Sequence, residues 1–317
     1  METSPTSEVE IGRSVEKGHW TNSHFIYNGQ GLFPFACNYD IAKTYCDVIN
    51  LYQSTFKDKT KIYCMIIPTL IEFSLPDAYQ SITDAQKPSI DYIYDHLSPD
   101  IITIDAYSKL HEHSNEYLYF NTDHHWTALG AYYAYTAFAE RAGFDPLVLE
   151  DCEVRTLQPF LGTIYSQTRD PVLLDNADKV DYYIIPGEYK VNRFINNEPF
   201  TAYPSSLYGE YAANENSYSV FLHGDFPMIR IDTQNNNGRR LLVSKESFGN
   251  AFVPFLIPHF EQIFVVDERY VQQGISRLVT ENNINEILFI NNIFAANTPI
   301  HINSMKRMMS DRFVNCY

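Results

Sequence analysis

The sequence has 317 residues, of which 45% are hydrophobic and 20% are charged, and its formal net charge is −16. This length suits one large α/β domain with an insertion, or two smaller domains, and the composition excludes collagen-like, coiled-coil and disordered chains. The excess of acidic residues repels phosphate groups, which argues against binding to nucleic acids or to anionic membrane surfaces.

Neither a transmembrane helix nor a signal peptide is visible in the sequence. The chain lacks an apolar run of 18 residues, and its first residues are polar. We therefore expect a soluble chain, with any export signal or anchor upstream of Met1. Five cysteines without a Cys-x-x-Cys pair argue against a zinc ribbon and a full disulfide framework, but leave room for one disulfide.

The first half of the chain alternates between patterns typical of strands and of helices. Residues 1–18 are expected to form a disordered or extended lead-in, and Asn28-Gly29 predicts a hairpin between short aromatic runs. The next expected elements are a helix over Asp40–Phe56, a strand over Lys61–Pro68, a helix over Pro88–Leu97, a strand over Ile101–Ala106 and a helix over His125–Gly143.

The pattern changes between about residues 151 and 230, where short β-type runs are separated by Pro, Gly and Asn. We predict an antiparallel β insertion there, packed beside the main sheet, with a glycan groove between the two parts. The alternation then returns, with strands expected over Arg240–Val243, Ile263–Val266 and Ile287–Ile290 and helices over Asn250–Phe260 and Val271–Asn282. Such alternation predicts a mostly parallel sheet with helices on both faces.

A group of polar residues, Asp123-His124-His125-Trp126, stands where a loop meets the expected helix. A carboxylate two residues before an imidazole can accept from its Nδ1–H, fix its tautomer and stabilise the imidazolium formed in catalysis. The alternative is that Asp123 caps the helix and the histidines are surface residues.

Ser247 follows an apolar strand and opens an amphipathic helix. This is where α/β folds place nucleophiles, because the helix N-terminus offers N–H groups to an oxyanion; a plain N-cap is the alternative. Asn291 and Asn292 follow the next apolar strand. Their amides are candidates for the same oxyanion, and their alternative is a turn.

These segments together resemble the bacterial DHHW family. The run Thr122–Thr127 with Gly130-Ala131-Tyr132-Tyr133 resembles its signature, and later blocks follow in the expected order. Those blocks are Gly224–Pro227, Glu246–Asn250, Pro254–Leu256 and Val266–Tyr270. The family is similar to the SGNH-hydrolase-like acetyltransferase proteins of alginate biosynthesis, in which an Asp-x-His-Trp motif precedes the serine.

The resemblance implies roles for three residues: Asp123 orients the imidazole, His125 is the base and Ser247 is the nucleophile. His124 takes the variable position between Asp123 and His125. Glu246 stands where the family usually has Asp, which puts the local turn in question. Further candidates for oxyanion or substrate binding are Asn292, Asn291, Asn250, Gly249, Arg269 and Trp126.

The implied fold is an SGNH-hydrolase-like, flavodoxin-like three-layer α/β/α domain over residues 19–317, with the β insertion at 151–230. The implied function is O-acetyl transfer to cell-envelope or exopolysaccharide sugars, outside the cell, without a cofactor and with a membrane-embedded acetyl-donor protein as a partner. A carbohydrate O-acetylesterase and a catalytically silent glycan-binding module are the alternatives.

Metal binding is a weaker alternative. His111, His113, Asp123, His124 and His125 cluster in the sequence. However, adjacent His124 and His125 do not easily share one ion, and no further ligand spacing follows. We therefore expect no metal at the site.

Overall fold

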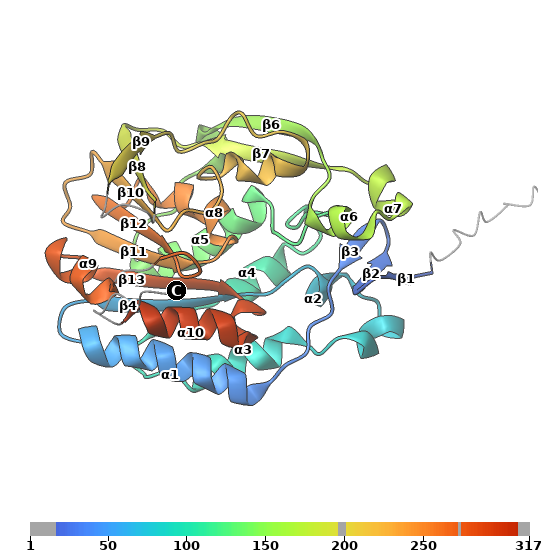
Figure 1. Ribbon diagram of the computed structural model, residues 1–317, viewed down its shortest axis with the longest axis horizontal. Coiled ribbons are helices and arrows are strands. Elements are labelled where there is room, and N and C mark those ends of the chain that lie inside the picture. The colour runs from blue at the N-terminus through green and yellow to red at the C-terminus, as the bar shows by residue number, and fades with distance from the viewer. Residues whose placement is uncertain (1–16, 196–200, 272–273, 310–317) are drawn as a thin grey trace, which may run out of the picture.

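The computed structural model describes residues 17–195, 201–271 and 274–309 (Figure 1). Residues 1–16 of the expected lead-in lie outside them. An eight-stranded sheet forms the centre of the fold, in the order β5-β4-β13-β11-β12-β10-β8-β9. Its strands are β4 (Lys61–Ile67), β5 (Ile102–Ile104), β8 (Tyr189–Phe194), β9 (Ala202–Ser205), β10 (Met228–Thr233), β11 (Arg240–Lys245), β12 (Gln262–Asp267) and β13 (Glu286–Asn292).

The five strands from β5 to β12 are parallel, and four of them are the apolar runs from which a parallel sheet was predicted. That prediction is confirmed. Ser244 pairs with Phe289 of β13 and Val266 of β12, so these three strands end together. Their carboxyl ends therefore present the following loops at one edge of the sheet.

Both faces of the sheet are buried, which explains the continuous apolar runs. Along β4, Tyr63, Met65 and Ile67 face one core, while Ile62, Cys64 and Ile66 face the other. The second core is covered by α1 (Tyr39–Phe56), α3 (Gln86–Asp95), α9 (Ile275–Glu281) and α10 (Pro299–Met308) (Figure 1). The first is covered by α4 (Ala106–Glu112), α5 (Ala128–Ala142) and α8 (Gly249–Phe252).

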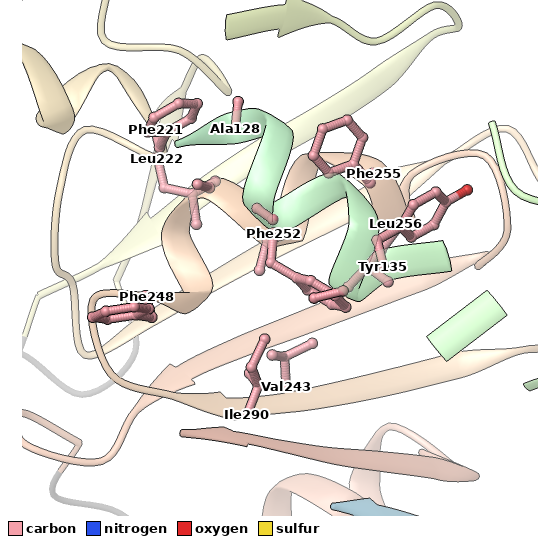
Figure 2. Packing of buried hydrophobic residues seen from close by; sticks show 14 of the residues in the cluster. Ala128, Tyr135, Phe221, Leu222, Val243, Phe248, Phe252, Phe255, Leu256 and Ile290 are labelled. Atoms are coloured by element: carbon pink, nitrogen blue, oxygen red, sulfur yellow. The ribbon is translucent and has the colours of Figure 1, made fainter. Parts of the chain in front are cut away.

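Figure 2 shows how the first core brings the two functional segments together. Tyr135 of α5 and Phe252 of α8 lie in one cluster with Val243 of β11 and Ile290 of β13. The ring centroids of Tyr135 and Phe252 are 6.4 Å apart. Burial of these aromatic side chains fixes α5 against the segment that follows Ser247.

The region 151–230 is antiparallel, as predicted, but only part of it packs beside the sheet. Strands β6 (Glu153–Phe160) and β7 (Asp178–Ile184) form a separate pair, joined through the short helices α6 (Thr163–Thr168) and α7 (Pro171–Asp175). Strands β8, β9 and β10 instead extend the main sheet beyond β12. The prediction was wrong for these three strands, because an unpaired β12 edge would expose its backbone donors and acceptors.

Several predicted helices begin or end elsewhere. Helix α5 begins at Ala128, capped by Thr127 Oγ1, so Asp123 and His125 lie in the preceding loop; Gly143 ends it with φ +77°, as expected. The helix expected over Asn250–Phe260 is α8 followed by a 3-10 turn, η4 (Val253–Leu256), because Pro254 lacks an N–H donor. The helix expected over Val271–Asn282 is the shorter α9, and residues 272–273 lie outside the described residues.

The remaining elements are small. The predicted hairpin is a three-stranded antiparallel sheet of β1 (His19–Thr21), β2 (His24–Tyr27) and β3 (Gln30–Leu32). The short helical segments are α2 (Ile71–Ser74), η1 (Asp77–Ile82), η2 (Leu149–Asp151), η3 (Asn214–Val220) and η5 (Ala295–Asn297). Cys37, Cys46, Cys64 and Cys152 are free thiols, and Cys316 lies outside the described residues. Among the described helices, none has the length and hydropathy needed to cross a bilayer.

Candidate active site

Ser247 and His125 are 122 residues apart in the sequence and meet at the carboxyl edge of the sheet. The His125 Nε2 atom lies 2.7 Å from the Ser247 hydroxyl oxygen. On the other side of the ring, His125 Nδ1 lies 2.6 Å from Asp123 Oδ1. Asp123 and His125 are buried, whereas Ser247 is half-buried. The structure thus brings the three predicted residues into one continuous chain of hydrogen bonds.

Asp123 accepts four hydrogen bonds. Its Oδ1 atom also accepts from the backbone N–H of His125 at 3.0 Å, while Oδ2 accepts from the N–H and hydroxyl of Thr163 at 2.8 and 2.9 Å. Burial opposes ionisation of the carboxyl group, but the neighbouring His125 and His124 and these donors hold its pKa well below the usual range. Asp123 is therefore an ionised, acceptor-only group.

Thr163 and Gly162 were not predicted as part of the site. They lie at the start of α6, about forty residues further along the chain. A Cβ atom on Gly162 would lie 2.2 Å from Asp123 Cβ, so only glycine permits this approach. No local sequence signal identifies either residue, because the contact is made entirely by tertiary structure.

The His125 ring lies between two other rings. Tyr218 of η3 stacks on it with centroids 3.9 Å apart and planes inclined by 10°, and His124 lies 3.8 Å away on an inclined plane. The Tyr218 hydroxyl donates to the carbonyl oxygen of Ser247 at 3.0 Å. Tyr218, another residue that the sequence did not identify, therefore contacts both His125 and Ser247.

Glu246 organises the turn that carries Ser247. Its Oε2 atom accepts from the N–H of Phe248 at 3.0 Å and lies 3.4 Å from the Ser247 hydroxyl, while Oε1 accepts from the N–H of Asn292 at 3.0 Å. The longer side chain at this position thus connects the nucleophile turn to the end of β13. The turn is also tight, since a Cβ atom on Gly249 would lie 2.6 Å from Lys245 Cβ.

Ion pairs around Lys245, the last residue of β11, lie next to the turn that carries Ser247. Lys245, only 1% exposed, contacts Asp267 at 2.9 Å and Asp225 at 3.1 Å, and Arg269 contacts both carboxylates. Burial alone would lower the pKa of Lys245, but the two carboxylates raise it. Asp225 also accepts from the Asn250 amide at 2.8 Å. These contacts tie the strand end, the turn and the start of α8 together.

Most of the predicted oxyanion candidates are engaged elsewhere, so those predictions need correction. Asn291 is fully buried and donates to Glu268, Asn250 donates to Asp225, and the Gly249 N–H donates to Glu246 O. Arg269 is bound to its two carboxylates, and the Trp126 indole donates to Phe248 O at 2.9 Å.

Among the described residues, two donors beside the Ser247 hydroxyl have no hydrogen-bond acceptor. The Asn292 carbonyl oxygen accepts from the N–H of Ala295, which leaves the amide nitrogen of this half-buried side chain as a donor. Within the described parts of the chain, neither that amide nor the N–H of Ser247 has a protein acceptor. Asn292 therefore stays a candidate for the oxyanion, and the N–H of Ser247 joins it.

Among the described residues, one group of side chains could hold a metal ion: Asp123, His124 and His125. Of its ligand atoms, His125 Nδ1 and Nε2, both Asp123 oxygens and His124 Nδ1 are already in hydrogen bonds. His113 is bonded to Glu116 and His111 is exposed near Tyr107, so neither joins the group. A metal ion at this group would have to replace hydrogen bonds that these atoms already make.

Comparison with known proteins identifies the family. A family model described as "DHHW protein" matches residues 8–266. The crystal structure of a DHHW family protein from Eubacterium siraeum DSM 15702 is 30% identical, with a TM-score of 0.87, over 94% of this chain and 99% of that chain. The structure of Bacillus cereus PatB1 with a sulfonyl adduct is 21% identical, with a TM-score of 0.71, over 90% of this chain and 97% of that one.

A more distant likeness is to the O-acetyltransferase domain of Pseudomonas putida AlgJ, which is 12% identical, with a TM-score of 0.47, over 91% and 97% of the two chains. No curated protein matches the chain. Both the family model and the Eubacterium siraeum structure cover most of the sequence. The chain belongs to the DHHW family.

Proposed function

We propose that this chain is a serine acyl-transfer enzyme of SGNH-hydrolase-like fold, with Ser247 as nucleophile, His125 as base and Asp123 as the carboxylate that orients it. The observation that carries the proposal is the chain of hydrogen bonds from Asp123 through His125 to the Ser247 hydroxyl. Such a chain activates a serine that is otherwise a weak nucleophile.

In the first half-reaction, the Ser247 oxygen attacks an ester carbonyl while His125 Nε2 takes its proton. The imidazolium that forms is stabilised by ionised Asp123 and by the face of Tyr218. The Ser247 N–H and the Asn292 amide are the donors available to the oxyanion. Collapse of the intermediate expels the alcohol, which takes the proton from His125, and leaves an acyl ester on Ser247.

In the second half-reaction, a new hydroxyl group attacks that acyl ester. We propose that the enzyme is a carbohydrate O-acetyltransferase acting on cell-envelope or exopolysaccharide sugars outside the cell, supplied by a membrane-embedded acetyl-donor protein. The DHHW resemblance supports this assignment. A carbohydrate O-acetylesterase is the second candidate, favoured by the half-buried, solvent-accessible Ser247. A catalytically silent glycan-binding module is the third.

Covalent labelling tests the nucleophile directly. Sulfonyl fluorides react with activated serine hydroxyls, and the PatB1 structure carries a sulfonyl adduct. We expect phenylmethylsulfonyl fluoride to label the wild-type chain at Ser247, and p-nitrophenyl acetate to give a burst of nitrophenol. Ser247→Ala should abolish both, and His125→Ala should reduce acylation by roughly 10³-fold or more, because triad members act as a unit.

Ser54→Ala, which changes an exposed serine on α1, is the matched control. Treatment with EDTA should leave the burst unaltered, whereas a metal site at Asp123, His124 and His125 would lose its activity. Turnover by Ser247→Ala at the wild-type rate would rule out the proposal. A wild-type chain that forms neither adduct nor nitrophenol would favour the glycan-binding module.

A further inference from the structure

His124 has no role in the proposed triad, but its side chain contacts two residues of the site, Thr163 and His125. Its Nδ1 atom lies 2.6 Å from Thr163 Oγ1, and its ring contacts the ring of His125. Its side chain is 45% exposed, in contrast to the buried Asp123 beside it. His124 thus forms part of the solvent-facing wall next to the base.

The hydrogen bonds around Thr163 fix the tautomer of His124. Thr163 has a single hydroxyl proton, and it donates that proton to Asp123 Oδ2 because the ionised carboxylate can only accept. Toward His124, the Thr163 oxygen therefore acts as an acceptor. The proton on the His124 ring must then reside on Nδ1, where it is donated to Thr163.

This tautomer leaves a lone pair on His124 Nε2 when the ring is neutral. Although nearly half of the side chain is exposed, loss of water around the ring, together with the neighbouring His125, lowers the pKa of His124 to about 4. The ring is thus neutral at pH 7. None of the residues that the structure describes bonds to Nε2, which faces away from Thr163.

We propose that His124 binds the acyl acceptor: its Nε2 atom accepts a hydrogen bond from a hydroxyl group adjacent to the one that reacts. The reacting hydroxyl must donate to His125 Nε2, which removes its proton, so His124 engages a second hydroxyl of the same molecule. Because the ring centroids of the two histidines are only 3.8 Å apart, hydroxyls on neighbouring carbons of one molecule can contact both rings. The site therefore selects a vicinal polyol over a simple alcohol.

The inference rests on the proposed function and concerns its second half-reaction. There the acceptor oxygen forms a bond to the acyl carbon, and the bond from that carbon to Ser247 Oγ breaks. The acceptor proton passes to His125 Nε2 and then to Ser247 Oγ, which restores the free enzyme. His124 exchanges no proton in these steps; it holds the acceptor in the orientation for attack.

The experiment compares two acceptors that differ by one hydroxyl, 1,2-propanediol and 1-propanol, with p-nitrophenyl acetate as the acyl donor. The measured quantity is the ratio of transfer to hydrolysis for each acceptor. We expect the wild-type enzyme to favour the diol. In His124→Asn, the amide nitrogen can still donate to Thr163, but the acceptor at Nε2 is lost. The ratio of transfer to hydrolysis for the diol should fall about tenfold, which corresponds to the loss of one ordinary hydrogen bond. The burst rate should change less than this ratio.

His124→Gln, which places a polar atom near the Nε2 position, should recover part of the diol preference. His111→Asn, at an exposed histidine outside the site, is the matched control. Equal diol preference in wild type and His124→Asn would overturn the inference while the nitrophenol burst still supports the triad, and so would a wild type without diol preference. An absent burst in the wild type would instead remove the proposed function, and the inference with it.

Discussion

The His125 Nε2 atom and the Ser247 hydroxyl oxygen lie 2.7 Å apart. The loop that carries Asp123 and His125 (the base loop) and the turn that carries Ser247 (the nucleophile turn) are nevertheless held by different kinds of interaction. The base loop is held by neutral donors, by stacked rings and by the close approach of Gly162 to Asp123. The nucleophile turn is held by charged groups: the Glu246 carboxylate, which accepts from two backbone N–H groups, and the ion pairs around the buried Lys245. The base gains a charge during the proposed reaction, whereas the nucleophile needs only a fixed position.

The base loop and the nucleophile turn should therefore respond differently to substitution. Buried ion pairs leave an uncompensated charge when one partner is removed, so the nucleophile turn should respond through stability. Ring stacking and close packing set geometry, so the base loop should respond through activity.

Lys245→Met should destabilise the protein by about 3–5 kcal/mol, because Asp267 and Asp225 are then left with Arg269 as their shared cation and one negative charge is uncompensated. Urea denaturation at pH 7 measures the free energy of unfolding. Lys43→Met removes an exposed lysine that pairs with Asp47 on α1, and should leave the free energy of unfolding almost unchanged, because solvent screens this pair. Equal costs for the two substitutions would show that the buried pairs do not stabilise the turn.

Gly162→Ala should lower the rate of acylation by roughly 10²-fold, since the new methyl group must displace Asp123. The burst rate with p-nitrophenyl acetate measures this loss. Gly143→Ala is the matched control, because its added Cβ would meet nothing within 4 Å. The residue has φ +77°, so the substitution strains the backbone without touching the site. It should cost about 1 kcal/mol of stability and leave acylation at the wild-type level. A Gly162→Ala enzyme that acylates normally would contradict the importance of this close approach.

Tyr218→Leu should lower acylation about tenfold by removing the ring that faces His125, corresponding to ~1.4 kcal/mol. Tyr218→Phe keeps the ring and removes only the hydroxyl that donates to Ser247 O, so its loss should be smaller. Comparing the acylation rates of the two variants separates the contribution of the ring from that of the hydroxyl. If both variants lose the same activity, the hydroxyl rather than the ring is the important group.

Thr163→Val should have the smallest effect, about 1 kcal/mol of stability at pH 7, because the Thr163 N–H remains to donate to Asp123. The pKa of Asp123 is depressed in the fold, so its contribution is present above its ordinary value of 3.8 and is lost as pH falls toward the folded pKa. The difference between wild type and Thr163→Val should therefore shrink below pH 3.8. A difference that grows in acid would show that the hydroxyl does not stabilise the ionised carboxylate.

The sequence predicted those features of the fold that depend on local residue patterns. Strands such as β4 and β11 were identified because burial on both faces requires continuous apolar runs. The placement of β10 was wrong, because its residues indicate a short strand but not which strand it pairs with. The turn at Pro254 ended α8 earlier than the apolar spacing suggested.

The candidate site was predicted only in part. Asp123, His125 and Ser247 carry motifs that the family resemblance connects, although each alone also suits a helix cap or a surface position. Gly162, Thr163 and Tyr218 reach the site through the fold alone, and nothing near them in the sequence marks their role. Asn291 and Asn250 were named as candidates for oxyanion or substrate binding, but their amides donate to the carboxylates of Glu268 and Asp225 instead.

The bond from the Trp126 indole to Phe248 O gives the protein a built-in optical reporter. The chain has only two tryptophans, and Trp20 is 53% exposed whereas Trp126 is fully buried. After Trp20→Phe, all tryptophan emission would come from an indole whose N–H is bonded to the peptide that follows the nucleophile. The wavelength and intensity of that emission would follow the contact between the base loop and the nucleophile turn, in real time and without an added label.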